Sequence, residues 1–146
     1  MINRLLATLL LPAAAFAQHA APPAKPHNKP IKVQFGIASY YAAKFEGRKT
    51  FTDEIFHEDS LTAASNTLPM HTWVRVTNLR NQKTVIVRIN DKMHPRNRRL
   101  IDLSRAAAEI LGFAGRGLTR VRVDVLGKGK KKPPEETAGV TIQNER

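Results

Sequence analysis

The sequence predicts a small, mainly β domain that closes into a barrel. Between residues 33 and 126, short segments alternate apolar and polar residues with the period of half-buried strands, and one segment has helical spacing. The 146 residues are enough for one compact domain. Many short strands with a single short helix are typical of a small closed barrel, in which every strand has a partner on both sides.

The strand-like segments come first. Residues 33–41 (VQFGIASYY) alternate and are rich in β-forming side chains, and residues 61–65 (LTAAS) form a short apolar stretch. In residues 72–79 (TWVRVTNL), valines on one face alternate with Trp, Arg and Thr on the other. A tight turn leads into residues 84–90 (TVIVRIN), so these last two segments are expected to form a hairpin.

A helix and a closing strand follow. Residues 104–113 (SRAAAEILGF) are expected to be helical, with Ser104 as N-cap and Gly112 as the stop. The residues expected to share the buried face of this helix are Ala107, Ile110 and Leu111. In residues 118–126 (LTRVRVDVL), the valines are expected to point inward and the arginines outward, which places Asp124 on the surface.

The segments that flank the domain lack the apolar residues of a core. Residues 1–17 hold one arginine, an apolar run shorter than the ~20 residues of a membrane span, and a small-x-small motif that ends at Ala17. This pattern indicates a cleaved signal peptide. Residues 18–32 are rich in Pro and Lys, as in an extended linker, and residues 127–146 form a charged tail that we expect to be disordered. We therefore expect an exported protein whose mature chain has no integral membrane span.

The charge balance favours an anionic partner. Lys and Arg number 24 and Asp and Glu 12, which gives a formal net charge of +12 at pH 7. Such a balance attracts nucleic acid, acidic lipid headgroups or an anionic cell-wall polymer, and export favours the cell envelope or periplasm over nucleic acid. The absence of cysteine excludes disulfides, thiolate metal sites and a lipid anchor attached through cysteine.

Few acidic residues are candidates for chemistry. Asp91 ends a strand, where its spacing fits both a turn carboxylate that bonds backbone N–H groups and a catalytic one. Glu54 is equally open, because Thr52 is also able to cap a helical turn there. Asp102, just before the helix, fits a helix-start or hydrogen-bonding role better than catalysis. The histidines lack HxxxH or HxH spacing, so we expect no metal site and no cofactor.

Two further features are an expected ion pair and a group of aromatic residues. Glu46 lies close to Arg48 in the sequence and is expected to pair with it. Four aromatic residues fit either a platform on which sugars stack or ordinary core packing. These residues are Tyr40, Tyr41, Phe45 and Trp73.

Four stretches follow one another in an order typical of one known family. They are GIASYYAAKFEGRKTFTDEIF, LTAASNTLP, VRVTNLRNQKTVIVRINDKMHPRNRRLIDLS and AAAEILGF. They resemble the rare lipoprotein A family, the septal-ring lytic transglycosylases of the bacterial envelope, over about residues 36–126. The resemblance implies a six-stranded double-psi β-barrel with one or two short helices, related in architecture to expansins and some endoglucanases.

The resemblance also implies a substrate and a reaction. The substrate is the glycan strand of peptidoglycan, preferentially stripped of stem peptides, with division-site envelope proteins as further partners. The bond between N-acetylmuramic acid and N-acetylglucosamine is cleaved without water, and the new end is a 1,6-anhydro sugar. One carboxylic acid protonates the leaving oxygen and then, as a carboxylate, removes the proton from the C6 hydroxyl.

The family motifs assign roles to particular positions. Asp91 matches the Asp of Asn-Asp-Arg-Gly-Pro, and Glu54 matches the Glu of Thr-Ala-Asn-Gly-Glu, which reads Thr-Phe-Thr-Asp-Glu here. The resemblance thus implies catalytic roles for both. His57 replaces a family Asp and Ser65 replaces a family His. These two residues and Asn90 are expected to shape the site, with His57 as a hypothetical source of the imidazole that Ser65 lacks.

Recognition of the substrate is expected at Tyr40, Tyr41 and Arg48. After Asp91, Lys92 replaces the family Arg, and Met-His-Pro replaces Gly-Pro. These replacements and the basic surface leave a second function open, that of a non-catalytic, expansin-like module that binds peptidoglycan. A nucleic-acid-binding role is disfavoured by export.

Overall fold

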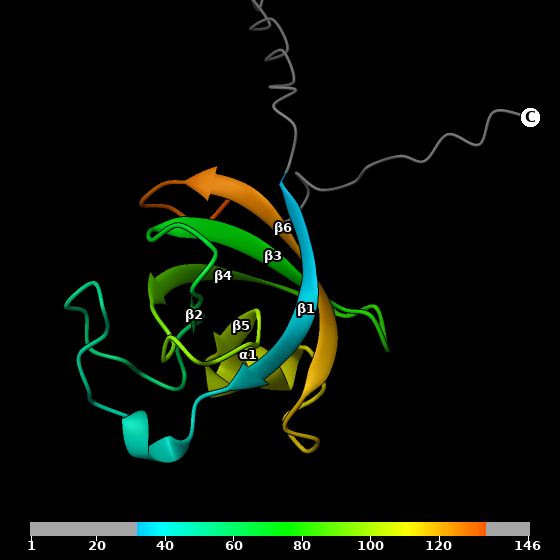
Figure 1. Cartoon of the computed structure of the whole chain (residues 1–146), viewed down its shortest axis with the longest axis horizontal. Helices are drawn as coiled ribbons and strands as arrows, with labels where there is room; N and C mark the ends of the chain where they lie inside the picture. The colour runs from blue at the N-terminus through cyan, green and yellow to red at the C-terminus, as the bar shows by residue number, and fades with distance from the viewer. Residues whose placement is uncertain (1–31, 134–146) are drawn as a thin grey trace, which may run out of the picture.

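The computed structural model describes residues 32–133, which form six strands, one α-helix and one 3₁₀ turn (Figure 1). In chain order these elements are β1 (Val33–Tyr40), η1 (Ala43–Phe45), β2 (Thr62–Ala64), β3 (Thr72–Asn78), β4 (Thr84–Asp91), β5 (Ile101–Leu103), α1 (Arg105–Ile110) and β6 (Thr119–Lys128). The predicted signal peptide, most of the linker and the end of the tail lie outside the described residues. None of the helices within 32–133 is long and apolar enough to cross a membrane.

The six strands close into a barrel in the order β1-β5-β2-β4-β3-β6. The pairs β1–β5 and β2–β4 are parallel, and the other pairs are antiparallel. The predicted hairpin is β3–β4, with Thr77 opposite Thr84. This mixed, closed barrel with little helix is consistent with a double-psi β-barrel, so the predicted fold class is confirmed.

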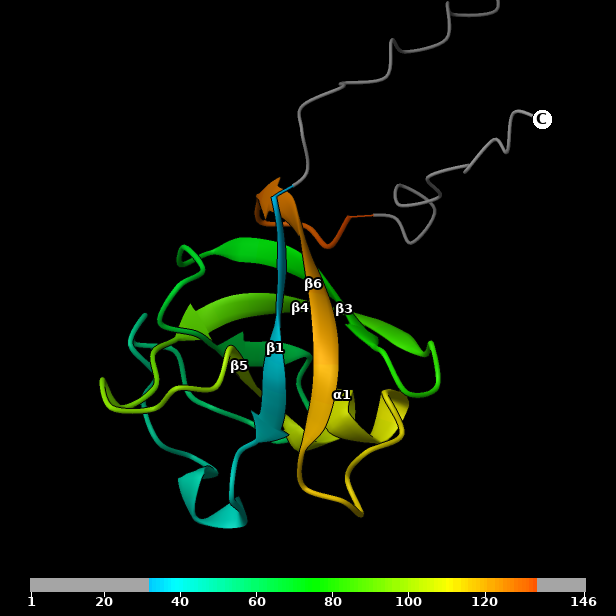
Figure 2. The same ribbon diagram turned by 45° about the vertical axis from the view of Figure 1, so that its right-hand side comes forward.

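The core fills the barrel and continues under α1. The fully buried residues from the strands are mostly β-branched, as expected where alternate side chains point inward. They include Val74, Val76, Val87, Ile89, Ile101, Val121 and Val123. α1 lies at the lower end of the barrel in both views (Figures 1 and 2). Its neighbours Leu111 and Phe113 are also fully buried, so this end of the barrel is sealed by apolar side chains.

The helix is shorter than predicted, but its ends follow the predicted signals. The Ser104 side chain accepts a hydrogen bond from the Ala107 N–H, and Gly112 adopts a φ of 74° directly after the helix. The prediction for Ile110 is wrong, because this side chain is 47% exposed. Ala107, Ala108 and Leu111 form the buried stripe. With 3.6 residues per turn, position 110 lies on the side of Ala107 that is opposite to Ala108 and Leu111, and so it points to solvent.

The expected exposure of Asp124 is also wrong, since this residue is only 7% exposed. It lies opposite Val33 on one side and Arg75 on the other. Its Oδ1 accepts hydrogen bonds from Arg122 at 3.0 and 2.7 Å. Arg122 on the same strand pairs with this carboxylate, and β1 and β3 flank it, so its burial cannot be read from alternation within one strand.

Gly36 allows the β4–β5 loop to approach β1 closely, which fixes one wall of the site described below. A Cβ at Gly36 would lie 2.6 Å from the Leu100 Cβ. The Leu100 N–H donates to the Ile37 carbonyl at 2.9 Å, so Leu100 is held in place by the backbone.

We predict that Gly36→Ala lowers the free energy of unfolding by about 1–3 kcal/mol, because the methyl group overpacks this contact. Gly115→Ala is the matched control, since no heavy atom lies within 4 Å of its Cβ position. The control should change stability by less than about 1 kcal/mol. Urea unfolding of both variants measures the difference, and equal effects would contradict the close approach.

Candidate active site

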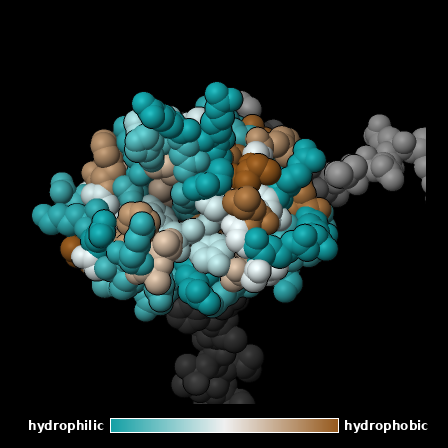
Figure 3. All heavy atoms as spheres, turned by 60° about the horizontal axis from the view of Figure 1, so that its bottom comes forward, coloured by the Kyte–Doolittle hydropathy of each residue, from teal (hydrophilic) through white to brown (hydrophobic). Residues whose placement is uncertain are grey.

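A cleft of about 640 Å³ opens where β1, β2, β4 and β5 meet the segment after β1 and the β4–β5 loop. Its lining combines aromatic rings, five Lys and Arg side chains and two carboxylates, Asp91 and Asp102. The lower end of the barrel, turned toward the viewer in Figure 3, has a mostly hydrophilic surface with separate hydrophobic patches. The cleft is large enough for part of a polymer, and its lining offers both apolar and charged side chains to a ligand.

Asp91, the last residue of β4, has both carboxylate oxygens engaged. Oδ1 accepts the backbone N–H groups of Phe51 and Lys92, each at 2.8 Å, and Oδ2 accepts the Tyr41 hydroxyl at 2.7 Å. The bond to Lys92 is the local one expected of a turn carboxylate. The other two partners come from distant segments, so Asp91 ties three parts of the cleft together.

Tyr41 belongs to an aromatic wall. Its ring lies 4.3 Å from the Phe56 ring and 5.7 Å from the Phe45 ring, centroid to centroid, and Arg48 lies over Phe45. Burial, and then the hydrogen bond to Asp91, raise the pKa of Tyr41 far above its ordinary value. Tyr41 therefore keeps its hydroxyl proton at any physiological pH.

The other two aromatic candidates are placed differently. Tyr40 lines the cleft, but its hydroxyl donates to the Ala114 carbonyl at 2.6 Å and its ring meets Phe113 edge-on. Trp73 lies outside the cleft lining and donates from Nε1 to the Gly129 carbonyl at 2.8 Å. The aromatic wall thus consists of Tyr41, with Phe45 and Phe56, and the sequence reasoning missed Phe56.

Asp102 is a second carboxylate on the same face of the sheet. Ala64 of β2 pairs with Asp91 of β4 on one side and with Asp102 of β5 on the other. Laterally paired residues point to the same face, and strands lie ~4.8 Å apart, so the two aspartates flank Ala64 with their Cα atoms roughly 10 Å apart. The prediction of a hydrogen-bonding role is confirmed, but the helix cap is Ser104.

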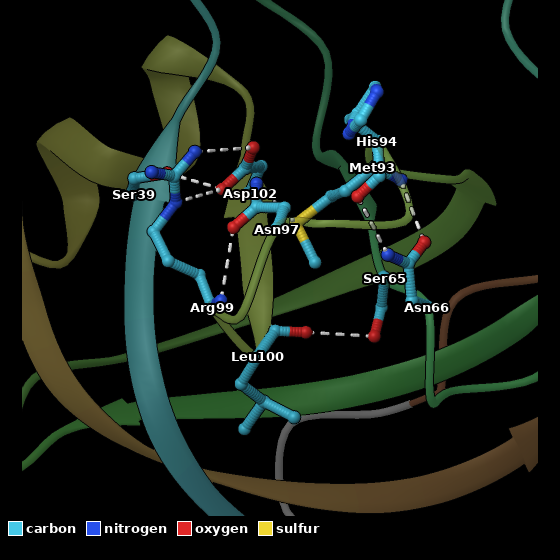
Figure 4. A network of polar contacts seen from close by, with 9 residues as sticks. All are labelled: Ser39, Ser65, Asn66, Met93, His94, Asn97, Arg99, Leu100 and Asp102. Carbon is cyan, nitrogen blue, oxygen red and sulfur yellow. Dashed lines mark hydrogen bonds and ion pairs between the residues drawn. The ribbon is translucent and has the colours of Figure 1, made fainter.

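Asp102 is held on both oxygens (Figure 4). Ser39 donates its hydroxyl to Oδ1, and Arg99 donates to Oδ1 at 3.0 Å and to Oδ2 at 3.3 Å. The Asp102 side chain is only 16% exposed. No sequence motif marks this residue as part of the cleft, because its place depends on the lateral register through Ala64.

Glu54 lies beside the cleft but is not among the described residues that line it. Arg88 donates to both of its oxygens, and Asn90 donates to Oε2 at 3.1 Å. These hydrogen bonds, that of Arg88 above all, hold the pKa of Glu54 below its ordinary value. The alternative of a helical turn capped by Thr52 is not formed, since Asp53 has a φ of 62° and the segment is a turn.

Asn90 makes two contacts with the loop that contains Glu54 and whose Phe51 N–H donates to Asp91. Its side chain donates to Glu54, and its carbonyl accepts the Thr52 N–H at 3.2 Å. Through the Thr50–Glu54 turn, Glu54 and Asn90 fix the position of the Phe51 N–H that holds Asp91. The structure therefore connects Glu54 with Asp91 through the backbone.

The structure does not bring His57 and Ser65 together. The His57 ring contacts Glu46 at 2.8 Å, and of the described residues, those that line the cleft do not include His57. The expected Glu46–Arg48 pair is replaced by this contact. Ser65 is buried and donates to the Leu100 carbonyl at 2.8 Å (Figure 4). The imidazole that does line the cleft is that of His94, which points away from the Asp102–Arg99 pair in Figure 4.

The cleft carries more positive than negative side chains. Its five cationic residues are Lys44, Arg48, Lys49, Lys92 and Arg99. Within residues 32–133, no three His, Asp or Glu side chains are grouped so that they could hold a metal ion. The side chains that line the cleft offer carboxylates, a tyrosine hydroxyl, the imidazole of His94 and basic groups.

Barrel and cleft together define a double-psi β-barrel protein with two carboxylates in a basic, aromatic-walled groove. Residues 33–123 match a family model described as "Lytic transglycolase". The chain belongs to this family, which confirms the resemblance found in the sequence.

Curated relatives agree with this assignment. The chain is 54% identical to a Pasteurella multocida protein over 107 residues, which cover 73% of this chain and 36% of the relative. It is 46% identical to a Haemophilus influenzae protein over 98 residues (67% and 34%) and 42% identical to a Neisseria meningitidis protein over 109 residues (75% and 46%). Each of the three is named "Endolytic peptidoglycan transglycosylase RlpA". The chain spans less than half the length of these relatives.

Solved structures show the same fold at lower identity. The Streptomyces papain inhibitor aligns with a TM-score of 0.53 and 24% identity over 66% of this chain and 96% of its own. The expansin of Clavibacter michiganensis aligns with a TM-score of 0.52 and 19% identity over 70% of this chain and 54% of its own. At these identities the two structures support the fold alone.

The Glu54–Arg88 pair predicts how stability depends on pH. Because the pKa of Glu54 is lowered in the folded protein, the unfolded chain binds this proton more tightly. The pair therefore stabilises the fold at neutral pH, and this stability is lost as the pH falls below the ordinary value of 4.5 and through the folded value.

We expect Glu54→Gln to cost about 1 kcal/mol at pH 7, a small figure because the partly exposed pair is screened by solvent. At pH 3 the difference from the wild type should shrink. Glu109→Gln, which removes an exposed helical ion pair, is the control. Urea unfolding at both pH values measures the effect, and a Glu54→Gln penalty that grows on acidification would contradict the assignment.

Proposed function

We propose that this protein is an endolytic peptidoglycan lytic transglycosylase. It cleaves the bond between N-acetylmuramic acid and N-acetylglucosamine in glycan strands and leaves 1,6-anhydro ends. The observation that carries the proposal is the carboxylate of Asp91, fixed by three hydrogen bonds in a cleft of a chain that belongs to the lytic transglycolase family. The names of the relatives support the same reaction.

The geometry distinguishes the two oxygens of Asp91. Oδ1 accepts hydrogen bonds from two backbone N–H groups, which can donate but cannot accept, so a proton on Oδ1 would break both bonds. Oδ2 faces the Tyr41 hydroxyl, which donates to a carboxylate and accepts from a carboxylic acid by rotating its hydrogen. Oδ2 is therefore the oxygen that carries the catalytic proton, and Oδ1 is the anchor.

The reaction follows in two proton transfers. Protonated Asp91 gives its proton from Oδ2 to the glycosidic oxygen as the bond from C1 to that oxygen breaks. The carboxylate then takes the proton of the C6 hydroxyl, whose oxygen bonds to C1 and closes the anhydro ring. Asp91 ends protonated, as it began, and no water is consumed.

Asp102 supplies a second negative charge at the cleft. Positive charge develops at C1 as the leaving group departs, and a fixed carboxylate on the same sheet face stabilises it. Ser39 and Arg99 hold Asp102 in one orientation, so it needs no rearrangement during the reaction. Glu54 acts as a positioning residue, because it fixes the turn whose N–H group holds Asp91.

The substrate places the protein in the cell envelope. Export through the segment 1–17, without a lipid attached to cysteine, would bring it to the periplasm, where division-site proteins are its expected partners. Tyr41 and Arg48 contribute to substrate binding from the aromatic wall, and Tyr40 lines the cleft beside them.

A second candidate function is binding without cleavage, as in an expansin-like module. The observation that favours it is the basic lining of the cleft, which attracts an anionic glycan whether or not it is cut. His57 also stands apart from the cleft lining, so it is not placed to supply there the imidazole that Ser65 lacks.

The two functions differ in what Asp91→Asn does. We expect the wild type to release 1,6-anhydro ends from glycan strands without stem peptides, detected by mass spectrometry. Asp91→Asn should reduce the rate at least ~100-fold, because it removes the general acid and base, yet still pellet with sacculi. Glu109→Gln is the control with full activity. Absence of anhydro ends from folded wild type would reject catalysis and leave the binding function.

Tyr41→Phe tests the partner of Oδ2. The variant keeps the ring contacts with Phe56 and Phe45 but removes the hydroxyl that adapts to both states of Asp91. We expect kcat to fall about 10- to 100-fold, the effect of losing a hydrogen bond to a charged group, with a smaller change in KM. Tyr40→Phe, which loses a hydroxyl bonded to Ala114, should lower kcat less. Equal kcat values for the two variants would contradict the role of Tyr41.

A further inference from the structure

An exposed aromatic ring stands beside the proposed catalytic carboxylate. Phe51 is 58% exposed, although burial of such a side chain is favourable. The ring is not displayed by a loose segment, since loop 49–55 is closed by an antiparallel bridge at its ends. Inside the loop, the Thr50 N–H donates to the Glu54 carbonyl at 2.8 Å. An ordered loop thus presents Phe51 to solvent, as binding surfaces do.

Lys92 completes this feature. Its Nζ lies 4.2 Å from the centroid of the Phe51 ring, a cation–π contact. The backbone N–H groups of the same two residues both donate to Oδ1 of Asp91, each at 2.8 Å. The backbone of both residues is therefore hydrogen-bonded to the proposed catalytic carboxylate, which places the ring and the ammonium group next to Asp91.

The Phe51–Lys92 pair lies at the border of the cleft. Lys92 lines the cleft, whereas Phe51 stands just outside its lining. Where the family motif has Ala, this chain has Phe51, so the ring is a feature of this chain and not of the motif. Further positive charge lies on the cleft at Lys44 and Lys49. A glycan strand that leaves the cleft on this side passes the cations that line the cleft and meets the Phe51 ring outside this lining.

We propose that Phe51 and Lys92 form a subsite for a pyranose that carries a carboxylate, namely a muramic residue free of its stem peptide. The C–H face of the sugar packs on the ring, as apolar groups do on aromatic faces. Exposed cation–π contacts are weak, so Lys92 exchanges the ring for the lactyl carboxylate, with which it forms a charge-assisted hydrogen bond. This inference rests on the proposed function, because it takes a peptidoglycan glycan as the ligand.

The test measures binding in an Asp91→Asn background, in which the glycan stays intact. Calorimetry gives Kd for a muramic-containing glycan with free lactyl carboxylates and for the same glycan with these groups converted to amides. Phe51→Ala should weaken binding of both about five- to tenfold, the loss of one aromatic contact. Lys92→Ala should weaken only the carboxylate form, about two- to fivefold, and salt should remove this difference. Both variants keep the backbone N–H groups that hold residue 91.

Matched controls use the same side chains elsewhere. Phe35→Ala removes a ring that is 67% exposed on β1, and Lys83→Ala removes an exposed lysine of the β3–β4 hairpin. Both should leave Kd unchanged, and Phe51→Trp should retain binding. The subsite is overturned if Phe51→Ala and Phe35→Ala bind alike, or if Lys92→Ala affects both glycans equally.

The binding experiment tests the subsite and the digestion assay tests catalysis, so either claim can be rejected without the other. Anhydro ends from the wild type together with unchanged Kd in Phe51→Ala would leave the enzyme and reject the subsite. No anhydro ends together with the expected pattern of Kd values would reject catalysis and support the subsite of a glycan-binding protein.

Discussion

The site depends on how Asp91 is held. Three hydrogen bonds from Tyr41, Phe51 and Lys92 connect the end of β1, the loop before β2 and the end of β4 at one carboxylate. Each donor comes from a segment that has other fixed contacts, such as the stack of Tyr41 on Phe56. A group held in this way loses little freedom when it reacts, which is the condition for efficient proton transfer.

Barrel closure brings these segments together. The parallel pair β2–β4 and the antiparallel pair β2–β5 place Asp91 and Asp102 on either side of Ala64, whose small side chain leaves room between them. Closure also sets the wall of the cleft that the β4–β5 loop forms, since Gly36 lets Leu100 of this loop approach β1 closely. The fold therefore positions both carboxylates through backbone pairing, and the side chains around them refine the arrangement.

Local sequence patterns predicted the strands and the helix, whereas the contacts of the site residues depend on pairing between distant segments. Alternation and capping residues are properties of neighbouring positions, so the hairpin and the N-cap at Ser104 were predictable. The partners of Asp91 were not, because Tyr41 lies 50 residues away and Phe51 lies 40. Asp102 was assigned a hydrogen-bonding role correctly, but its place in the cleft follows from the register with Ala64. The buried state of Asp124 likewise depends on cover from strands that pair only in the closed barrel.

Two of the three donors on Asp91 are backbone amides, and every residue except proline offers one. Substitution at positions 51 and 92 thus leaves the carboxylate in place while it changes the surface that a ligand meets. The replacement of the motif alanine by Phe51 keeps this hydrogen bond, because position 51 contributes its backbone N–H and not its side chain.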